Sequence, residues 1–198
     1  IWLASCNKDN VSPQPSTPAA PVHYMMSMVP YNGNIIVGGG FSSIHGTPYS
    51  NIAEWNGASW VALGSGLKGQ VTALTVYNGN LIAAEDLNSG SDATSFSQLA
   101  QWNGASWDTL PGRFKYYTYN GVINSLAVYN GNLYAGGDFT VAGAITVNSI
   151  AKWNDTVWSS PGYGVTLDGS ATGIVSALAV YKGCLYAGGG FKWVNVSV

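Results

Sequence analysis

The 198-residue chain is 46% hydrophobic and 13% aromatic, but only 8% of its residues are charged, against about 25% in an average soluble protein. Seven Lys and Arg against nine Asp and Glu give a formal net charge of −2, which excludes the basic face that nucleic-acid binding needs. The composition, with 26 Gly, 12 Tyr and 8 Trp, also argues against disorder and helical bundles. It favours a turn-rich, all-β protein.

The first 21 residues differ from the rest of the chain. Residues 11–21 are rich in Pro, Ser, Thr and Ala, a composition typical of an extended, semi-stiff linker. Leu3-Ala4-Ser5-Cys6 resembles the lipobox of bacterial lipoproteins, in which a signal peptide is cleaved before an acylated Cys. The resemblance implies lipidation at Cys6 and a lipid-anchored place in the bacterial cell envelope, periplasmic or on the outer-membrane surface. A chance match in a small-residue stretch is the alternative. If Cys6 is acylated, Cys184 is expected to be a small buried hydrophobic residue.

From residue 22 onward the chain is a repeat. A Tyr-Asn-Gly-Asn motif begins at Tyr31, Tyr77 and Tyr129 and returns as Tyr-Lys-Gly-Cys at Tyr181, with spacings of 46, 52 and 52 residues. A second motif runs in step with it and has the form Ala-x-Trp-Asn-Gly-Ala-Ser-Trp, altered in its third copy. This motif contains six of the eight tryptophans, which we interpret as structural repeat residues: Trp55, Trp60, Trp102, Trp107, Trp153 and Trp158.

Each repeat is expected to form four short strands. The first strand is 71–77 in one copy and 123–129 and 175–181 in others. The Asn-Gly pair after it is the strongest short-range signal for a hairpin with a type I′ turn, and the glycines of these turns are Gly33, Gly79, Gly131 and Gly183. Second and third strands follow, as at 133–137 and 149–153. A further tight two-residue turn, Asn56-Gly57 in one copy and Asn154-Asp155 in another, leads to the fourth strand.

A period of about 50 residues with four strands predicts a β-propeller with four-stranded antiparallel blades. A β-sandwich is the runner-up, but it does not need so regular a repeat. We number the repeats unit 1 (22–70), unit 2 (71–122), unit 3 (123–173) and the partial unit 4 (174–198). About three and a half blades would leave unpaired edges and an exposed apolar flank. We therefore expect the natural protein to continue past residue 198, and this chain alone to be an open arc prone to associate.

The repeat motifs resemble a known group of proteins. The segment 129–139, Tyr-Asn-Gly-Asn-Leu-Tyr-Ala-Gly-Gly-Asp-Phe, with 148–153 after it, resembles the repeats of bacterial surface β-propellers. These are related in pattern to kelch repeats and to the fungal cortical cell-polarity marker family. The resemblance implies a role in adhesion, binding or scaffolding. Unit 2 departs from the pattern, because Ala84-Glu85-Asp86-Leu87 replaces the glycine-rich segment, and we expect a changed blade edge there.

Loop lengths indicate where a ligand could bind. Uniform two-residue turns are expected at one face. At the other face lie long loops that differ between units: 42–50, 88–97 and 140–148 after second strands, and 64–70, 111–121 and 161–173 after fourth strands. Variable loops on a rigid scaffold are common sites of function, and aromatic rings can stack on sugars. Filling space between blades is the alternative for these aromatics. The candidate ligand-binding residues are Arg113, Lys115, Tyr116, Tyr117, Tyr119 and Tyr163, with His45, Tyr49 and Asp168 as weaker ones.

Catalytic chemistry is hard to find in the sequence. The two histidines lie outside the repeat register, no spacing fits zinc, and no cofactor is expected. Adjacent Glu85 and Asp86 on a strand should point to opposite faces, unlike the facing carboxylates of a glycosidase. Asp138 is expected to cap a turn rather than to bind a cation.

We therefore expect a non-catalytic binding or adhesion module of the cell envelope, with a glycan or protein ligand. One alternative is a propeller-class lyase or glycosidase whose catalytic residues lie outside this fragment. The other is a purely structural repeat domain.

Overall fold

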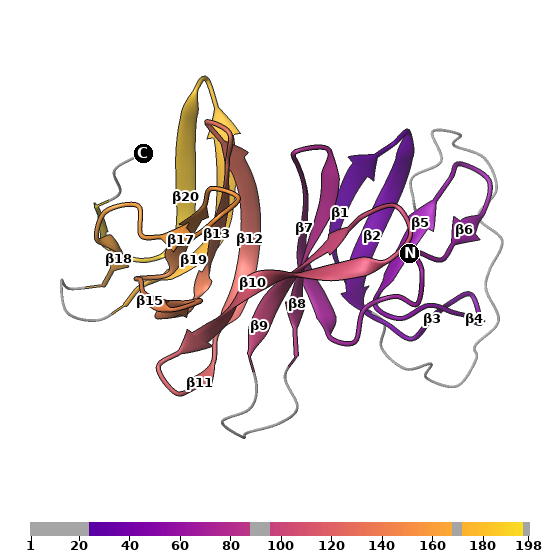
Figure 1. The fold of residues 1–198 in the computed structure, drawn as a ribbon, viewed down its shortest axis with the longest axis horizontal. Coiled ribbons are helices and arrows are strands. Elements are labelled where there is room, and N and C mark those ends of the chain that lie inside the picture. The colour runs from indigo at the N-terminus through magenta and orange to yellow at the C-terminus, as the bar shows by residue number, and fades with distance from the viewer. Residues whose placement is uncertain (1–23, 88–95, 168–171, 196–198) are drawn as a thin grey trace, which may run out of the picture.

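The protein is all-β, as its composition predicts. The structure, a computed structural model, describes residues 24–87, 96–167 and 172–195. These residues form strands β1 to β21 and no helix, so no described segment could cross a membrane as a helix. Figure 1 shows the strands as a succession of separate sheets from the N-terminal to the C-terminal part of the chain.

The repeat units correspond to antiparallel sheets. The order is β1-β2-β5-β6 in unit 1 and β12-β13-β16-β17 in unit 3, so the four strands of each sheet lie side by side in chain order. Unit 2 has the same order, β7-β8-β9-β10, and unit 4 contributes the hairpin β19–β20. The bounds are β1 Tyr24–Tyr31, β2 Asn34–Gly40, β5 Ile52–Trp55, β6 Trp60–Val61, β7 Gln70–Tyr77, β8 Asn80–Asp86, β9 Ser97–Trp102, β10 Trp107–Tyr116, β12 Val122–Tyr129, β13 Asn132–Asp138, β16 Ile150–Trp153, β17 Trp158–Ser159, β19 Ile174–Tyr181 and β20 Cys184–Gly190.

Short strands connect the units at one edge. Strand β10 runs on to pair with β14, so β14 and β15 of unit 3 join the sheet of unit 2, and β11 also pairs with β10. Strand β18 of unit 3 pairs with β21 of unit 4 in the same way. The bounds are β3 Ser43–Ile44, β4 Thr47–Pro48, β11 Tyr119–Asn120, β14 Val141–Ala142, β15 Ile145–Thr146, β18 Gly164–Thr166 and β21 Trp193–Asn195.

The turns between first and second strands confirm the type I′ prediction. In the hairpin β12–β13, Asn130 has φ 46° and Gly131 has φ 71°. Lys182 and Gly183 have φ 47° and 73° in the hairpin β19–β20. A type I′ turn needs positive φ at both central residues, and the turns of units 1 and 2 have the same signs.

The predicted two-residue turn before the fourth strand is wrong. Strand β5 ends at Trp55 and β6 begins at Trp60, so four residues connect them. The Asn56 side-chain oxygen accepts hydrogen bonds from the backbone N–H of Ala58 at 3.0 Å and of Ser59 at 2.8 Å. Asn103 and Asn154 do the same in units 2 and 3. The asparagine side chain thus accepts hydrogen bonds from N–H groups that, in a two-residue turn, would bond to backbone carbonyls.

Tryptophans flank each of these four-residue loops. In each of the three pairs, Trp55–Trp60, Trp102–Trp107 and Trp153–Trp158, the ring centroids are 5.3 Å apart. The indole N–H of Trp107 donates to the Leu63 carbonyl at 3.1 Å, and that of Trp158 donates to the Pro111 carbonyl at 2.7 Å. Trp107 and Trp158 therefore attach units 2 and 3 to the chain segment that leaves the preceding unit.

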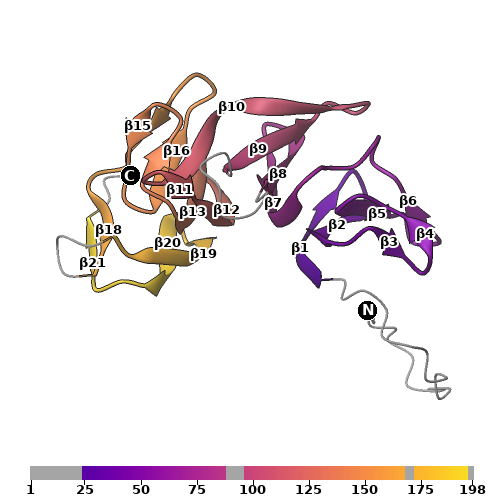
Figure 2. The same cartoon turned by 90° about the horizontal axis from the view of Figure 1, so that it is seen from below.

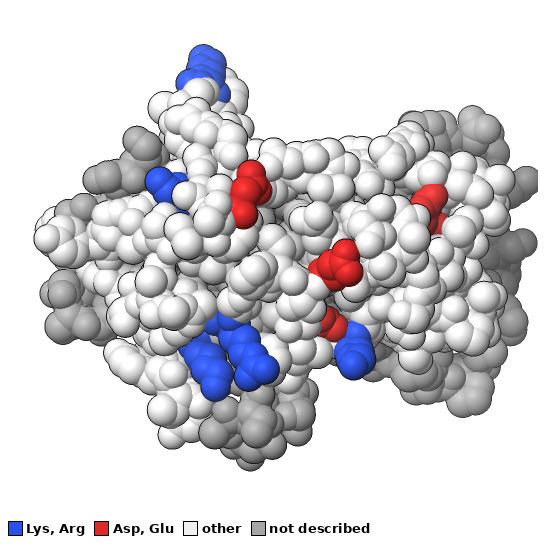
Figure 3. Space-filling model, viewed as in Figure 1, with Lys and Arg blue, Asp and Glu red and all other residues white. Residues whose placement is uncertain are grey.

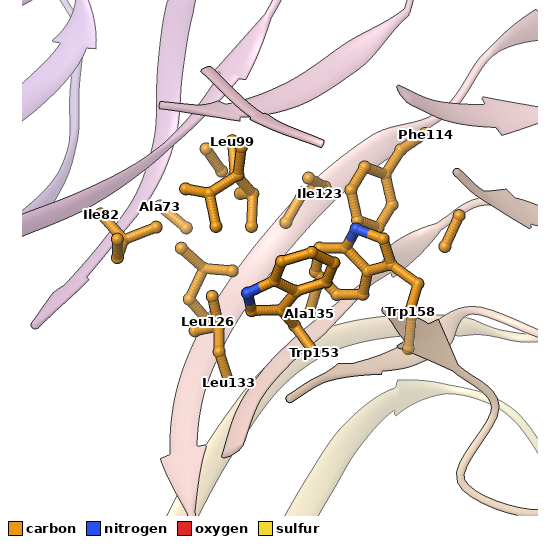
Figure 4. Packing of buried hydrophobic residues seen from close by; sticks show 14 of the residues in the cluster. Ala73, Ile82, Leu99, Phe114, Ile123, Leu126, Leu133, Ala135, Trp153 and Trp158 are labelled. Atoms are coloured by element: carbon orange, nitrogen blue, oxygen red, sulfur yellow. The ribbon is translucent and has the colours of Figure 1, made fainter. Parts of the chain in front are cut away.

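The hydrophobic core lies between successive sheets. One cluster joins unit 1 to unit 2 and includes Ile36, Val71 and Leu74. A larger one joins unit 2 to unit 3, where Ile82 and Leu99 meet Ile123, Leu126 and Trp153 (Figure 4). In Figure 2 the first strands β1, β7, β12 and β19 follow one another along the inner side of an arc, and each contacts the next.

The loops after second strands are less variable than expected. Residues 41–51 and 139–149 have matching backbone hydrogen bonds, but their turns differ: Gly46 has φ 82°, whereas the equivalent Ala144 has no positive φ. Tyr49 N–H donates to Ser42 O and Val147 N–H donates to Thr140 O, each at 2.9 Å. Each segment forms a small hairpin, β3–β4 or β14–β15, and residues 88–95 of unit 2 lie outside the described residues. The expectation that these loops differ in every unit is wrong in part for units 1 and 3, because equal length and matching backbone hydrogen bonds give both loops the same small hairpin, with different turns.

Candidate functional site

The segment 111–121, predicted to be a loop, is largely strand. Strand β10 continues to Tyr116, and Tyr116 pairs with Tyr119 of β11 across a tight turn. Phe114 is completely buried, with its ring edge-on to those of Phe139 and Trp158 at 4.9 Å each. Burial of this ring between units 2 and 3 holds the backbone in an extended conformation. For Phe114 the alternative that these aromatics fill space between units is therefore confirmed, whereas the loop prediction for 111–121 is wrong.

The five candidate residues of this segment share the β10–β11 hairpin. The Arg113 guanidinium lies over the Phe96 ring, 4.2 Å from its centroid. Lys115 and Tyr116 are half-buried, whereas Tyr117 and Tyr119 are 63% and 67% exposed. In Figure 3 charged side chains are sparse, and basic ones gather at the lower edge of the view, where Figure 1 places β11.

The other candidates lie elsewhere. Tyr163 is 76% exposed and precedes β18, so it belongs to a different element from the hairpin. Tyr49 is buried and donates from its hydroxyl to the Trp60 carbonyl at 3.1 Å. His45 is exposed at the turn between β3 and β4. Cys6 and Asp168 lie outside the described residues.

Cys184 is exposed, so the expectation that it is buried is wrong. It occupies the position that Asn34, Asn80 and Asn132 hold in the other units, directly after the turn and at the start of a second strand. The equivalent asparagines are half-buried, so the exposure of Cys184 goes with that of the β19–β20 hairpin, which is largely exposed.

A groove between units 1 and 2 is a site that the sequence did not reveal. Its volume is about 850 Å³. Unit 1 contributes the end of β2 with residues 41–42, residues 50–51 just before β5, and the connecting residues 65–68. Unit 2 contributes side chains of β8, β9 and β10. The residues that bear on binding are Asn51, Lys68, Glu85, Gln98, Trp107 and Asp108.

Glu85 is the buried charge of this groove. It is 3% exposed, and its carboxylate accepts hydrogen bonds from the Gly69 N–H at 2.7 Å and the Gln98 amide at 2.9 Å. The equivalent residues of units 1 and 3 are Gly39 and Gly137, where a Cβ would clash with a carbonyl oxygen of the first strand. In unit 2, β9 pairs regularly with β8, and Glu85 lies opposite Gln98.

The corresponding pairing is broken in units 1 and 3. Asn51 and Ser149, the residues equivalent to Gln98, have φ 63° and 61° and lie outside the ladder. The one signal of this difference in the sequence was the replacement of the glycine-rich segment at 84–87.

Asp86 and Asp138 do not line this groove. Asp86 accepts a hydrogen bond from the Asn120 side chain at 2.8 Å, so Glu85 and its neighbour have different partners, as expected for adjacent strand residues. Burial raises the pKa of the Asp138 carboxyl, and among the described residues no hydrogen bond to it is found. The expectation that Asp138 caps a turn is therefore not supported.

The groove suits a polar, largely uncharged ligand. Half-buried Trp107 offers an apolar surface, and the amides of Asn51 and Gln98 line the same space. Lys68 and Asp108 are exposed at the rim with opposite charges. Within the described residues no group of three His, Cys, Asp or Glu could hold a metal ion.

No protein-family model matches the chain, and a search of curated proteins also found no match. The resemblance to bacterial surface propellers therefore depends on the repeat motifs alone and stays a prediction.

Proposed function

We propose that the chain is part of a β-propeller and serves as a non-catalytic binding module. Three features support the propeller. Units 1 and 3 have the same four-strand order, successive sheets pack through apolar clusters, and the first strands are neighbours along one side. Such a scaffold holds clefts between rigid sheets, where ligands commonly bind.

The proposed ligand is a neutral saccharide bound in the groove between units 1 and 2. The observation that carries this proposal is the groove itself, about 850 Å³, with Trp107, amide side chains and a buried carboxylate along it. A tryptophan ring can lie against the apolar face of a sugar, while the exposed side chains of Lys68 and Asp108 can bind its hydroxyls. The near balance of charge at the rim favours a neutral ligand over an ionic one.

We propose that Glu85 positions the Gly69 backbone and the Gln98 side chain rather than exchanging protons with a substrate. Both of its oxygens accept hydrogen bonds within the protein, and the side chain is almost completely buried. A general acid or base must reach the atom to which it transfers a proton. This argues for binding without turnover, and release of reducing ends from an oligosaccharide would favour the lyase or glycosidase alternative.

The test is binding of an array of neutral oligosaccharides, followed by calorimetry on the best binder. We expect Lys68→Ala and Asp108→Ala each to weaken binding about three- to tenfold, the loss of roughly one hydrogen bond. Lys192→Ala removes an exposed lysine from unit 4 and is the matched control. Unchanged affinity in both groove variants, with folding intact, would exclude this site.

The β10–β11 hairpin is the second candidate site, for a glycan or a protein. Tyr117 and Tyr119 expose most of their surface there, on the same hairpin as Arg113. If the hairpin binds, Tyr117→Ala together with Tyr119→Ala should abolish binding that the groove variants leave intact. If neither set changes binding, the structural-repeat alternative gains support.

We also propose that Cys6 carries a lipid anchor and that the linker 11–21 holds the module away from the bacterial envelope. The support is the lipobox-like Leu3-Ala4-Ser5-Cys6 followed by the Pro-rich stretch. Mass spectrometry of the protein from its natural cells should find Cys6 acylated, and Cys6→Ala should move it from the detergent phase to the aqueous phase. An unmodified Cys6 would contradict this.

A further inference from the structure

A second cavity lies between units 2 and 3, and we call it the second cleft. Its volume is about 440 Å³. Unit 2 contributes one residue of β9 and residues 108–111 of β10, and unit 3 contributes the end of β16 with the loop that follows it. The residues that bear on binding are Gln101, Asp108, Thr109, Asp155 and Thr156.

The groove and the second cleft meet at one strand edge. Asp108 and Thr109 of β10 line both cavities. This part of β10 pairs with β9 alone, since β11 and β14 pair with residues 114–116 further along. The Trp107 indole binds a carbonyl of unit 1, whereas Leu110 packs in the cluster shared with unit 3. The two cavities therefore lie on opposite faces of β10 and join around its free edge.

Backbone groups of Thr109 are available at this edge. The Asn103 N–H donates to the Ser106 carbonyl at 3.1 Å, which makes these two residues a hydrogen-bonded pair of the β9–β10 hairpin. Such pairs alternate with non-hydrogen-bonded pairs along an antiparallel ladder. Asp108 therefore bonds to Gln101, and the N–H and C=O of Thr109 point away from β9. They can bind the hydroxyls of a ligand that crosses the edge.

The edge is also polar in its side chains. Asp108 and Thr109 are exposed, whereas unit 1 has Val61 and Ala62 at the equivalent positions. The Asp108 carboxylate accepts a hydrogen bond from the Asn103 side chain at 2.9 Å, which holds it in place. Among the described residues that line the second cleft there is no Lys or Arg. Its hydroxyl, amide and carboxylate side chains can all bind sugar hydroxyls.

We propose that the ligand is an oligosaccharide that fills the groove, crosses the edge at Thr109 and ends in the second cleft. The inference rests on the proposed function, because it begins from a saccharide in the groove. Every unit of a linear saccharide carries hydroxyls, so a long chain can bind polar groups all along this surface. A disaccharide in the groove leaves the second cleft empty. Joining two binding segments in one ligand strengthens binding, because the second segment binds from a high effective concentration.

The test compares ligand lengths by calorimetry on the full chain. The probes are neutral hexasaccharides, cellohexaose and maltohexaose among them, and the disaccharides with the same linkages. We expect the best hexasaccharide to bind at least about tenfold more tightly than its own disaccharide. Lys68→Ala, in the groove, should weaken the binding of both ligands, because both occupy the groove.

A double variant examines the second cleft alone. Gln101→Ala together with Thr156→Ala removes two polar side chains that line the second cleft and not the groove. It should weaken hexasaccharide binding about tenfold, the loss of roughly two hydrogen bonds, and leave the disaccharide affinity unchanged. Thr47→Ala is the matched control, because it removes an exposed threonine of β4 that lines neither cavity. Thermal unfolding checks that each variant is folded.

The outcomes separate this inference from the proposed function. Equal affinities for the two ligand lengths, with Lys68→Ala weakening both, would overturn the inference and leave the proposed function intact. If no saccharide binds, both fail. Loss of disaccharide binding in the double variant would also overturn the inference, because the short ligand would then already reach the second cleft. So would an equal loss of hexasaccharide binding with Thr47→Ala.

Discussion

Tyr77 illustrates how one buried hydroxyl joins two units. Its ring is buried, and its hydroxyl donates to the carbonyl of Gly131 in the next unit. Burial, and to a smaller extent the nearby Asp155 carboxylate, raises the pKa of Tyr77 to about 12. The same carboxylate accepts a hydrogen bond from Asn78 at 2.9 Å. The folded state therefore favours the protonated phenol.

This shift gives a prediction for alkaline pH. Tyr77 in the unfolded chain loses its proton near pH 10, while the folded chain keeps it to about pH 12. The contribution is fully present below pH 10 and is lost as the pH rises from about 10 to 12, by at most about tenfold in the unfolding constant per pH unit. Urea unfolding from pH 9 to 12 should show a smaller loss in Tyr77→Phe than in the wild type. Parallel losses would contradict the assignment.

At the scale of elements, the four I′ turns differ in one residue. Unit 4 has Lys182 where units 1 to 3 have Asn, yet its φ is 47° against 46° at Asn130. Asn tolerates the left-handed region better than Lys because its short polar side chain can bond locally. The hairpin thus imposes the same positive φ on either residue, and the residue type changes only the strain energy of the turn.

Reciprocal substitutions should reveal that strain. We expect Lys182→Asn to stabilise the protein and Asn130→Lys to destabilise it, each by up to about 1 kcal/mol. Denaturant unfolding of both variants measures the two effects. Changes of the same sign in the two variants would show that turn strain is not the cause.

At the scale of the whole molecule, stability is expected to be uneven along the chain. Unit 3 is packed on both sides, by unit 2 and by β19, whereas the β19–β20 hairpin is largely exposed. In repeat proteins each unit is stabilised mainly by its neighbours. The terminal hairpin should therefore open more often than internal ones.

Hydrogen exchange can measure this difference. Amides of β19–β20 should exchange at least about tenfold faster than the matched amides of β12–β13, which have the same register and turn. The comparison should be made at a low protein concentration, because this chain alone is expected to be prone to associate. Equal protection in the monomer would show that the chain unfolds as a single cooperative unit.

The sequence by itself determined the features that depend on neighbouring residues. Its repeat defines the first strands and the I′ turns, because Asn-Gly pairs and short apolar runs impose local conformations. It also indicated the all-β class. The same Asn-Gly pair at Asn56 gave a four-residue loop instead, because there the asparagine side chain binds the backbone.

Only the tertiary structure decided which surfaces meet. The sequence left open whether the aromatic residues of segment 111–121 bind a ligand or fill space between units. The structure places the Phe114 ring between units 2 and 3. The sequence predicted a changed blade edge at Glu85, whereas the pairing of β8 with β9 buries this residue in the groove. Of the proposed site, the sequence indicated only the altered segment around Glu85. Burial and cleft formation depend on contacts between residues distant in the chain, and no local pattern of residue types encodes them.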